Sequence, residues 1–284
     1  MNRNLHLAIA LAVATAFLST ACATDPEPTA RAAKDSPSSD SSIGHIHGLG
    51  IDPADDSLYV ATHFGLFHVP DTGKPSRVAD RWQDTMAFTV IGPGHFLGSG
   101  HPDLTEEHLP SHLGLIESTD AGETWTPLAL QGEADFHILE PAGDVLYAYD
   151  STTSRLLRTE DRERFEEILS GDLVSVAASK EAGRLFATTS KGQLISIDAP
   201  TGATRELGGP VTAYLDTTAE GGLVGIGPDG VVRVSGDAGK TWQEAGSIGG
   251  QPAAFTITEQ GWYAATAEEA FRSTDHGSTW EQVL

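Results

Sequence analysis

The chain has 284 residues, a formal net charge of -23 at pH 7 and 39% hydrophobic residues. This composition is typical of an acidic globular protein and excludes a bundle of membrane-spanning helices. So large a negative charge repels a phosphate backbone, and we therefore expect no nucleic-acid partner.

The first 21 residues predict a signal peptide. Arg3 precedes a mostly apolar run over 5–18, which is too short to span a membrane with normal margins. The single cysteine, Cys22, follows Ala21 at the place where a bacterial lipoprotein is cleaved and acylated. We therefore expect an extracytoplasmic protein anchored to the cell membrane through a lipid on Cys22. Ser19 stands where an aliphatic residue is usual in such sites, so ordinary secretion is the alternative.

A flexible linker is expected after the cysteine. Residues 22–42 are polar and rich in Pro, Ser and Asp, and they cannot bury a core. Residues 43–284 are then long enough for one sizeable folded domain.

The pattern S-x-D-x-G-x-T-W occurs three times, at 118–125, 235–242 and 273–280. Each copy stands between two strand-like segments, and its Ser, Asp and Gly favour tight turns, so each copy predicts a hairpin turn. Eroded copies extend the series and place aspartates at 71, 120, 161, 198, 237 and 275. The successive spacings are 49, 41, 37, 39 and 38 residues.

A repeat of about 40 residues built from short strands has the size of a four-stranded propeller blade. Six such units fill 43–284, so we predict an all-β protein with a six-bladed β-propeller fold. Blade 1 is expected to have strands at 45–49, 58–61, 65–68 and 76–78, and the later blades begin near 87, 136, 173, 211 and 254. Seven blades are the alternative, although the loop 101–112 accounts for the longest spacing. We expect blade 6 to pack on blade 1 without a swapped strand.

Histidines are concentrated in the first three blades. Of the 11 histidines in the chain, nine lie between 45 and 137. In an antiparallel blade, the start of the first strand and the end of the second lie on one face, opposite the repeated turns. The residues at these positions are expected to converge at one mouth of the central channel: His45, His47, His63, His101, His137 and Asp150. The equivalent positions of blades 4 to 6 are mostly apolar or small.

Three interpretations of this cluster stay open. Neutral histidine is the commonest protein ligand for divalent transition metals, which favours a Zn, Cu or Ni ion held by the six residues. Alternatively, acids on the same face form a catalytic or sugar-binding pocket, because a carboxylate pair can hydrolyse glycosides. These acids are Asp84, Asp103, Glu106, Glu107, Glu133, Asp135 and Asp150, of which Asp135 and Asp150 are the candidate catalytic residues. In the third interpretation the histidines only satisfy backbone groups around the channel.

The repeated turns resemble the Asp-box, or BNR, repeat of sialidase-like propellers. Four further segments resemble a bacterial lipoprotein branch labelled glycosyl hydrolase or exo-sialidase-like: His45-Ile46-His47-Gly48-Leu49-Gly50, Ser99-Gly100-His101-Pro102, Gly114-Leu115-Ile116-Glu117-Ser118 and Asp135-Phe136-His137. The resemblance covers 43–284 and implies the propeller fold. Photosystem assembly propellers share the repeat, but the acidic character of this chain gives no reason to prefer that role.

The resemblance gives little reason to expect sialidase chemistry. Sialidases use three arginines, a tyrosine nucleophile with a glutamate partner, an aspartic acid and a Phe-Arg-Ile-Pro segment, and no such segment occurs here. Arg158, Arg233 and Arg272 lie just before the turns, on the face opposite the histidines. We therefore expect metal binding first, glycoside hydrolysis second and a protein-interaction scaffold third. The partner at this face would be a small ligand, a glycan or a protein.

Overall fold

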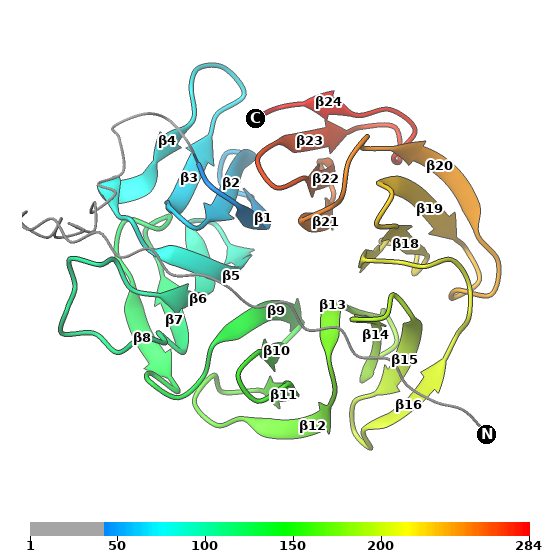
Figure 1. The fold of residues 1–284 in the computed structure, drawn as a ribbon, viewed down its shortest axis with the longest axis horizontal. Coiled ribbons are helices and arrows are strands. Elements are labelled where there is room, and N and C mark those ends of the chain that lie inside the picture. Colours follow the sequence, from blue (N-terminus) through cyan, green and yellow to red (C-terminus); the bar gives the residue numbers. More distant parts are fainter. Residues whose placement is uncertain (1–42) are drawn as a thin grey trace, which may run out of the picture. The chain divides into compact units, whose positions relative to one another are not determined.

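The computed structural model describes residues 43–284, which form a ring of six four-stranded antiparallel sheets (Figure 1). The expected all-β, six-bladed propeller is confirmed, and the seven-bladed alternative is wrong. Within the described residues, no helix is long and apolar enough to cross a membrane. The predicted signal peptide, the lipidated Cys22 and the linker lie outside the described residues.

Each blade consists of four strands that are consecutive in the chain, with the first strand innermost (Figure 1). Blades 1 to 3 contain β1 (Ile46–Asp52), β2 (Ser57–Thr62), β3 (Gly65–Val69), β4 (Ser76–Arg77), β5 (Asp84–Gly92), β6 (His95–His101), β7 (Leu115–Ser118), β8 (Thr126–Ala129), β9 (Phe136–Ala142), β10 (Val145–Asp150), β11 (Arg155–Thr159) and β12 (Glu166–Ser170). Blades 4 to 6 contain β13 (Leu173–Ala178), β14 (Arg184–Thr189), β15 (Leu194–Asp198), β16 (Ala203–Glu206), β17 (Tyr214–Thr217), β18 (Leu223–Ile226), β19 (Val231–Ser235), β20 (Gln243–Ser247), β21 (Ala254–Thr258), β22 (Gly261–Ala265), β23 (Ala270–Ser273) and β24 (Glu281–Gln282).

Several strand boundaries differ from the sequence prediction by a few residues; β5, for example, begins at Asp84 rather than near 87. The fourth strand of blade 1 ends at Arg77, because Val78 belongs to a short 3-10 helix, η1 (Val78–Asp80). Blade 5 begins at Tyr214 rather than near 211. The amide of Thr212 donates to the oxygen of Gly192 in blade 4 at 3.1 Å, so this segment bonds to the neighbouring blade before β17 begins.

The core lies between the blades. Six clusters of buried apolar side chains fill the six junctions between neighbouring sheets, one cluster at each junction. At the junction of blades 1 and 2, for example, Tyr59 and Phe88 each pack against Phe96, with ring centroids 4.8 Å and 5.3 Å apart. Burying one such side chain stabilises the fold by roughly 1.5–3 kcal/mol. The ring is therefore held together mainly by packing between sheets.

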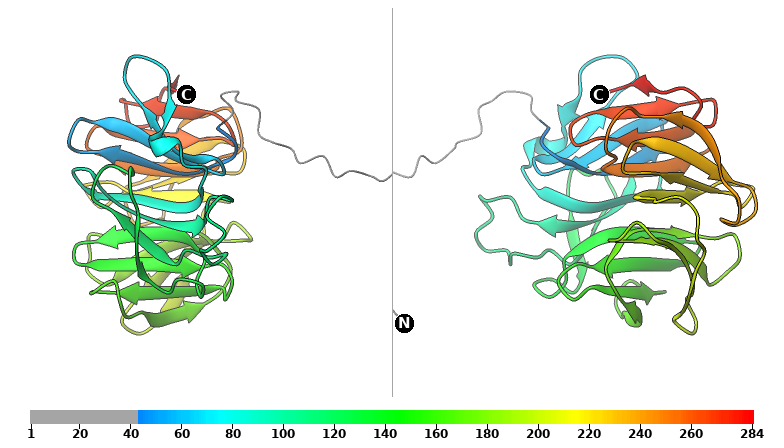
Figure 2. Two further views of the ribbon diagram at one scale, coloured as in Figure 1. Left: turned by 90° about the vertical axis from the view of Figure 1, so that its left-hand side faces the viewer. Right: turned by 45° about the vertical axis from the view of Figure 1, so that its right-hand side comes forward.

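The ring closes as expected, without strand exchange. The strands of blade 6 and blade 1 lie side by side in both side views, where they are coloured red and blue (Figure 2). One apolar cluster contains Ile46 and Val60 of blade 1 together with Tyr263 of blade 6. The amide of Ile46 also donates to the oxygen of Ala267 at 2.8 Å. Packing and this hydrogen bond join the first blade to the last.

The three S-x-D-x-G-x-T-W segments are turns between the third and fourth strands of blades 2, 5 and 6, as predicted. In the first turn, Ser118 Oγ donates to Asp120 at 2.8 Å and accepts from the Gly122 amide at 2.9 Å. Thr124 donates to both oxygens of Asp120 from its amide at 2.9 Å and its hydroxyl at 2.6 Å. Ala121 and Gly122 have φ of 58° and 88°, which explains the glycine at the second position. The other two turns repeat these bonds.

Candidate metal centre

The innermost strands carry a recurring irregularity where they enter the channel. The pairing of β1 with β2 skips one residue between Ile46 and Gly48, so His47 has no partner on β2. Equivalent shifts leave out Met86 in blade 2, His137 in blade 3 and Val174 in blade 4. All four of these residues line one central cavity of about 330 Å³. Such bulges often re-aim side chains at functional sites, and here they set residues against the channel.

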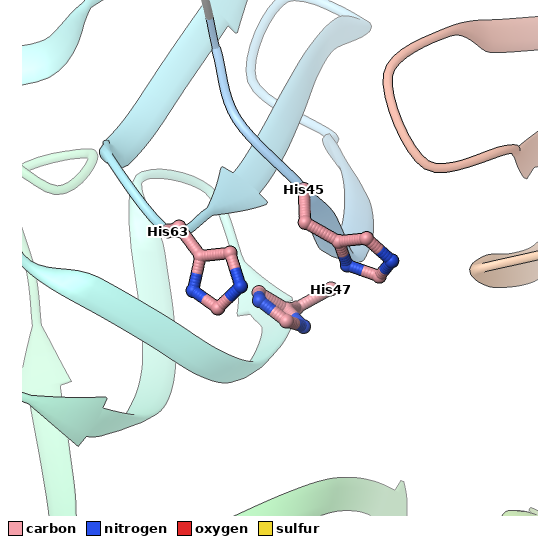
Figure 3. A group of neighbouring side chains, drawn as sticks. All are labelled: His45, His47 and His63. Atoms are coloured by element: carbon pink, nitrogen blue, oxygen red, sulfur yellow. The ribbon is translucent and has the colours of Figure 1, made fainter. Parts of the chain in front are cut away.

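Three histidines of blade 1 come together at this end of the channel (Figure 3). His45 precedes β1, His47 lies in β1 and His63 follows β2, and their rings lie close together, with centroids 4.4–5.8 Å apart. One ring nitrogen of each lies within 4.8 Å of the other two. Ligands bound to a zinc ion about 2.1 Å away in tetrahedral geometry are about 3.4 Å apart. Modest side-chain rotation would therefore bring all three nitrogens onto one ion.

Asp84, the first residue of β5, orients this group. Its Oδ1 lies 2.9 Å from Nδ1 of His63 and 3.9 Å from Nε2 of His47. A carboxylate can only accept a hydrogen bond from neutral His63, so Nδ1 carries the proton and Nε2 keeps a free lone pair. Metal-binding histidines are commonly held by a carboxylate in this way.

His47 is the most distinctive member of the group. Its Nε2 is buried and has no hydrogen-bond partner. Burial, followed by the neighbouring imidazoles of His63 and His45, lowers the pKa of His47 from 6.5 to about 3. The ring is therefore neutral at neutral pH. A buried polar atom without a partner costs roughly 1–3 kcal/mol, and a bound cation would remove that cost.

The other predicted ligands form a second group at the junction of blades 2 and 3. Asp135 Oδ2 lies 3.0 Å from Nε2 of His137 and 3.9 Å from Nε2 of His101. His112, from the connection between β6 and β7, joins His101 and Asp135 in a set whose ligand atoms lie within 4.8 Å of one another. Five of the six predicted metal ligands are thus divided between two places.

Asp150 belongs to neither group of potential ligands within 43–284. It is 4% exposed, and its carboxylate accepts hydrogen bonds from the Asp135 amide at 3.2 Å and from the amide and hydroxyl of Thr152 at 3.1 and 2.8 Å. The hydroxyl of Thr153 is a further donor, at 2.5 Å. These bonds hold the turn after β10 against the start of blade 3. They leave Asp150 little capacity to bind a metal or a substrate.

Two residues at these sites were not predicted as ligands or as their supports. Asp84 was expected on this face as one acid of a sugar-binding pocket, although it occupies in blade 2 the place that His45 occupies in blade 1. His112 stands in a long connection whose path no repeat predicts. Its proximity to His101, with ring centroids 5.4 Å apart, depends on that path.

The half of this face formed by blades 4 to 6 is hollow. A cavity of about 580 Å³ lies next to His45 and is lined by residues such as Lys191, Val211, Tyr214 and Gln251. A larger cavity of about 770 Å³ opens on the opposite face, at the turns between the first and second strands of blades 3 to 6, with His276 among its lining residues. No potential metal-binding group within 43–284 lies in that larger cavity. Of these two cavities, only the one of about 580 Å³ adjoins the histidines of blade 1.

No known protein family matches this chain, and no curated protein does. Solved structures share its fold. It is similar to a gluconolactonase from Xanthomonas campestris, with a TM-score of 0.65 and 13% identity over 80% of this chain and 84% of that one. It is also similar to virginiamycin B lyase from Staphylococcus aureus (0.58, 11%, covering 85% of each chain) and to YCF48 from Cyanidioschyzon merolae (0.51, 13%, covering 85% of each). At such identities the likeness shows the β-propeller fold alone.

Proposed function

We propose that this protein binds a divalent transition-metal ion, or a ligand that requires one, through His45, His47 and His63. The observation that carries the proposal is the environment of His47 Nε2. This atom is buried, unpartnered and uncharged. One ring nitrogen of His47 lies within 4.8 Å of a ring nitrogen of both His45 and His63. The contact between His63 and Asp84 supports the proposal, because it aims a second lone pair at the same place.

The ligand set favours zinc, copper or nickel. Three imidazole nitrogens suit these ions, whereas calcium and magnesium prefer oxygen ligands. Three protein ligands with one open position is also the pattern of catalytic zinc sites. The cavity of about 580 Å³ beside His45 is large enough for a small organic ligand next to the ion.

An extracytoplasmic location and a lipid anchor at Cys22 complete the proposal, with the apolar run over 5–18 and the place of the cysteine as support. The repeated hydrogen bonds of the three turns support membership in the Asp-box propellers. Glycoside hydrolysis has less support, because hydrogen bonds already occupy the carboxylate of Asp150.

Metal titration of the purified mature protein tests the proposal. After treatment with a chelator, the protein would be dialysed against Zn²⁺, Cu²⁺ or Ni²⁺ and then analysed for bound metal and melting temperature. We expect at least one ion per chain and a melting temperature that rises with metal concentration. His47→Ala should lose one ion.

The matched control is His276→Ala. It removes an imidazole from a turn remote from the channel histidines, and the other two turns already carry alanine there, as Ala121 and Ala238. This variant should bind metal as the parent protein does. A parent protein that binds no ion and keeps an unchanged melting temperature would disprove the proposal.

A further inference from the structure

We propose a second, separate metal site formed by His101, His112 and Asp135. His101 ends β6, His112 lies in the 102–114 connection to β7, and Asp135 directly precedes β9. One ligand atom from each residue lies within 4.8 Å of the other two. The site shares no residue with the three histidines of blade 1, so the two sites can be tested independently.

The protonation of His101 leaves the correct nitrogen free. Its Nδ1 lies 2.7 Å from the carbonyl oxygen of Ser111. A carbonyl can only accept, so Nδ1 carries the proton in the neutral ring and Nε2 keeps a lone pair. This Nε2 faces Asp135 at 3.9 Å. A backbone carbonyl that holds the far nitrogen of an imidazole is a common support for metal-binding histidines.

The other two residues each contribute a buried atom without a partner. These atoms are Nδ1 of His112 and Oδ1 of Asp135. Asp135 is only 6% exposed, so water has little access to its carboxylate. Unpartnered buried polar groups are rare in native proteins, and two at one place call for a common explanation. A cation between them would satisfy both at once.

The two oxygens of the Asp135 carboxylate have different roles: one holds neighbouring side chains and the other can bind the metal. Its Oδ2 contacts Nε2 of His137 at 3.0 Å and accepts from the hydroxyl of Ser151 at 3.1 Å, which leaves Oδ1 free. Burial acts to raise the pKa of Asp135, but the hydrogen bond from His137 and the nearby His101 outweigh it and lower the pKa. The free oxygen therefore belongs to an ionised group. His137 is a positioning residue in this arrangement rather than a ligand.

Two imidazoles and one carboxylate form a set that binds Zn²⁺ with an open fourth position. An ion here would tie the 102–114 connection to the start of blade 3. This connection is already attached by an ion pair between Arg81 and Glu106 at 2.7 Å and by a bond from the Trp82 amide to Asp103 at 2.8 Å. Near His112, the Gly132 amide also donates to the His112 carbonyl at 2.8 Å. Zinc should therefore order the stretch around His112.

Zinc stoichiometry in the full mature chain and five variants tests the inference. Equilibrium dialysis against Zn²⁺ should give two ions for the parent protein, one for His112→Ala, one for His47→Ala and none for the double variant. His108→Ala is the matched control, because it removes an exposed imidazole from the same connection. It should bind two ions. Asp135→Asn, which keeps the shape of the side chain, should bind one.

Hydrogen exchange of 102–114 supplies a second readout. Zinc should slow exchange in the parent protein and in His47→Ala, but not in His112→Ala. Two ions retained by His112→Ala would overturn the second site, as would a parent protein that binds one ion and loses it only with His47→Ala. One ion lost only with His112→Ala would support the second site while refuting the proposed function. Equal melting temperatures without zinc would show that the variants are folded.

Discussion

Polar side chains are concentrated both in the repeated turns and at the channel mouth, but the two regions differ in whether their buried polar atoms have hydrogen-bond partners. In the three S-x-D-x-G-x-T-W turns, Ser, Asp and Thr bond to one another and to the turn backbone, and none of their buried side-chain atoms lacks a partner within 43–284. At the histidine groups, by contrast, His47, His112 and Asp135 each keep a buried atom unpartnered. Closed hydrogen-bond networks serve the fold, whereas unpartnered atoms that are grouped among potential ligands leave room for a cation.

The bulges on the innermost strands show a related difference between the geometry and the residue types of the blades. Blades 1 to 4 share the bulge on the innermost strand, yet only blades 1 and 3 place a histidine there, at His47 and His137. The repeat therefore supplies the geometry in several blades, and the departures from the repeat supply the chemistry. Four substitutions test this difference between structural and ligand-binding positions.

Ser235→Ala should have the largest effect, on stability. Ser235 is 3% exposed, and its Oγ accepts from the Gly239 amide at 2.9 Å and donates to Asp237 at 2.9 Å. Its loss leaves a buried amide unpartnered, which costs about 2 kcal/mol. Urea unfolding would measure this, with Ser247→Ala on an exposed strand as the control. Metal binding should stay unchanged, and a loss of zinc with full stability would contradict a purely structural role for the turn.

Asp84→Asn should weaken zinc binding at the first site about 10-fold, or about 1.4 kcal/mol, because supports of metal-binding histidines typically contribute 10–100-fold. The amide can still contact His63 but no longer aligns it by charge. Isothermal titration with Zn²⁺ measures the change. The second site provides an internal control, since its affinity should not move. Equal weakening of both sites would show a general loss of structure instead.

His47→Leu should separate stability from binding. Without metal, removing a buried nitrogen that lacks a partner should leave the protein as stable as before or raise its free energy of unfolding by ~1 kcal/mol. The same change should abolish zinc binding at the first site. Thermal unfolding with and without Zn²⁺ tests both statements. Clear destabilisation of the metal-free protein would mean that His47 serves packing, and the contrast with Ser235 would fail.

The fold was predictable because the repeated turn recurs at a nearly constant spacing along the chain. Aspartates at a spacing near 40 residues located the turns, and the alternation of strands then located every blade. The grouping of His45, His47 and His63 followed from the same logic, because the start of the first strand and the end of the second share a face in any antiparallel blade.

The partition of the predicted ligands was not predictable in this way. Sequence position shows which face of the ring a residue occupies, but not how far apart two blades hold their side chains. His101 and His137 therefore appeared to belong with His47, while the structure sets them around Asp135. His112 was missed because its place depends on the path of the 102–114 connection. Asp150 lies outside both groups, and its four hydrogen bonds come from its own turn and a neighbouring amide.

The smallest effect is expected deeper in the channel, from Glu140 and Asp216. Both line the central cavity, and each accepts from a backbone amide of the next blade, Ala178 and Ile257, at 2.7 Å. Burial, followed by repulsion from Asp216, raises the pKa of Glu140 from 4.5 to about 8. The folded protein thus retains a proton that the unfolded chain releases. The resulting stability is fully present below about pH 4.5 and is lost as the pH rises toward 8.

Glu140→Gln keeps an oxygen that can accept from the Ala178 amide and removes the charge. The variant should match the parent protein near pH 5 and exceed it by on the order of 1 kcal/mol near pH 8. Urea unfolding in the presence of a chelator at both pH values measures the difference, with the exposed Glu133→Gln as the control. An equal decline in parent and variant would remove Glu140 from the explanation. A smaller decline of the free energy of unfolding with pH in the variant would show that the buried Glu140 carboxylate is stabilised by a proton, whereas the proposed sites are stabilised by a metal ion.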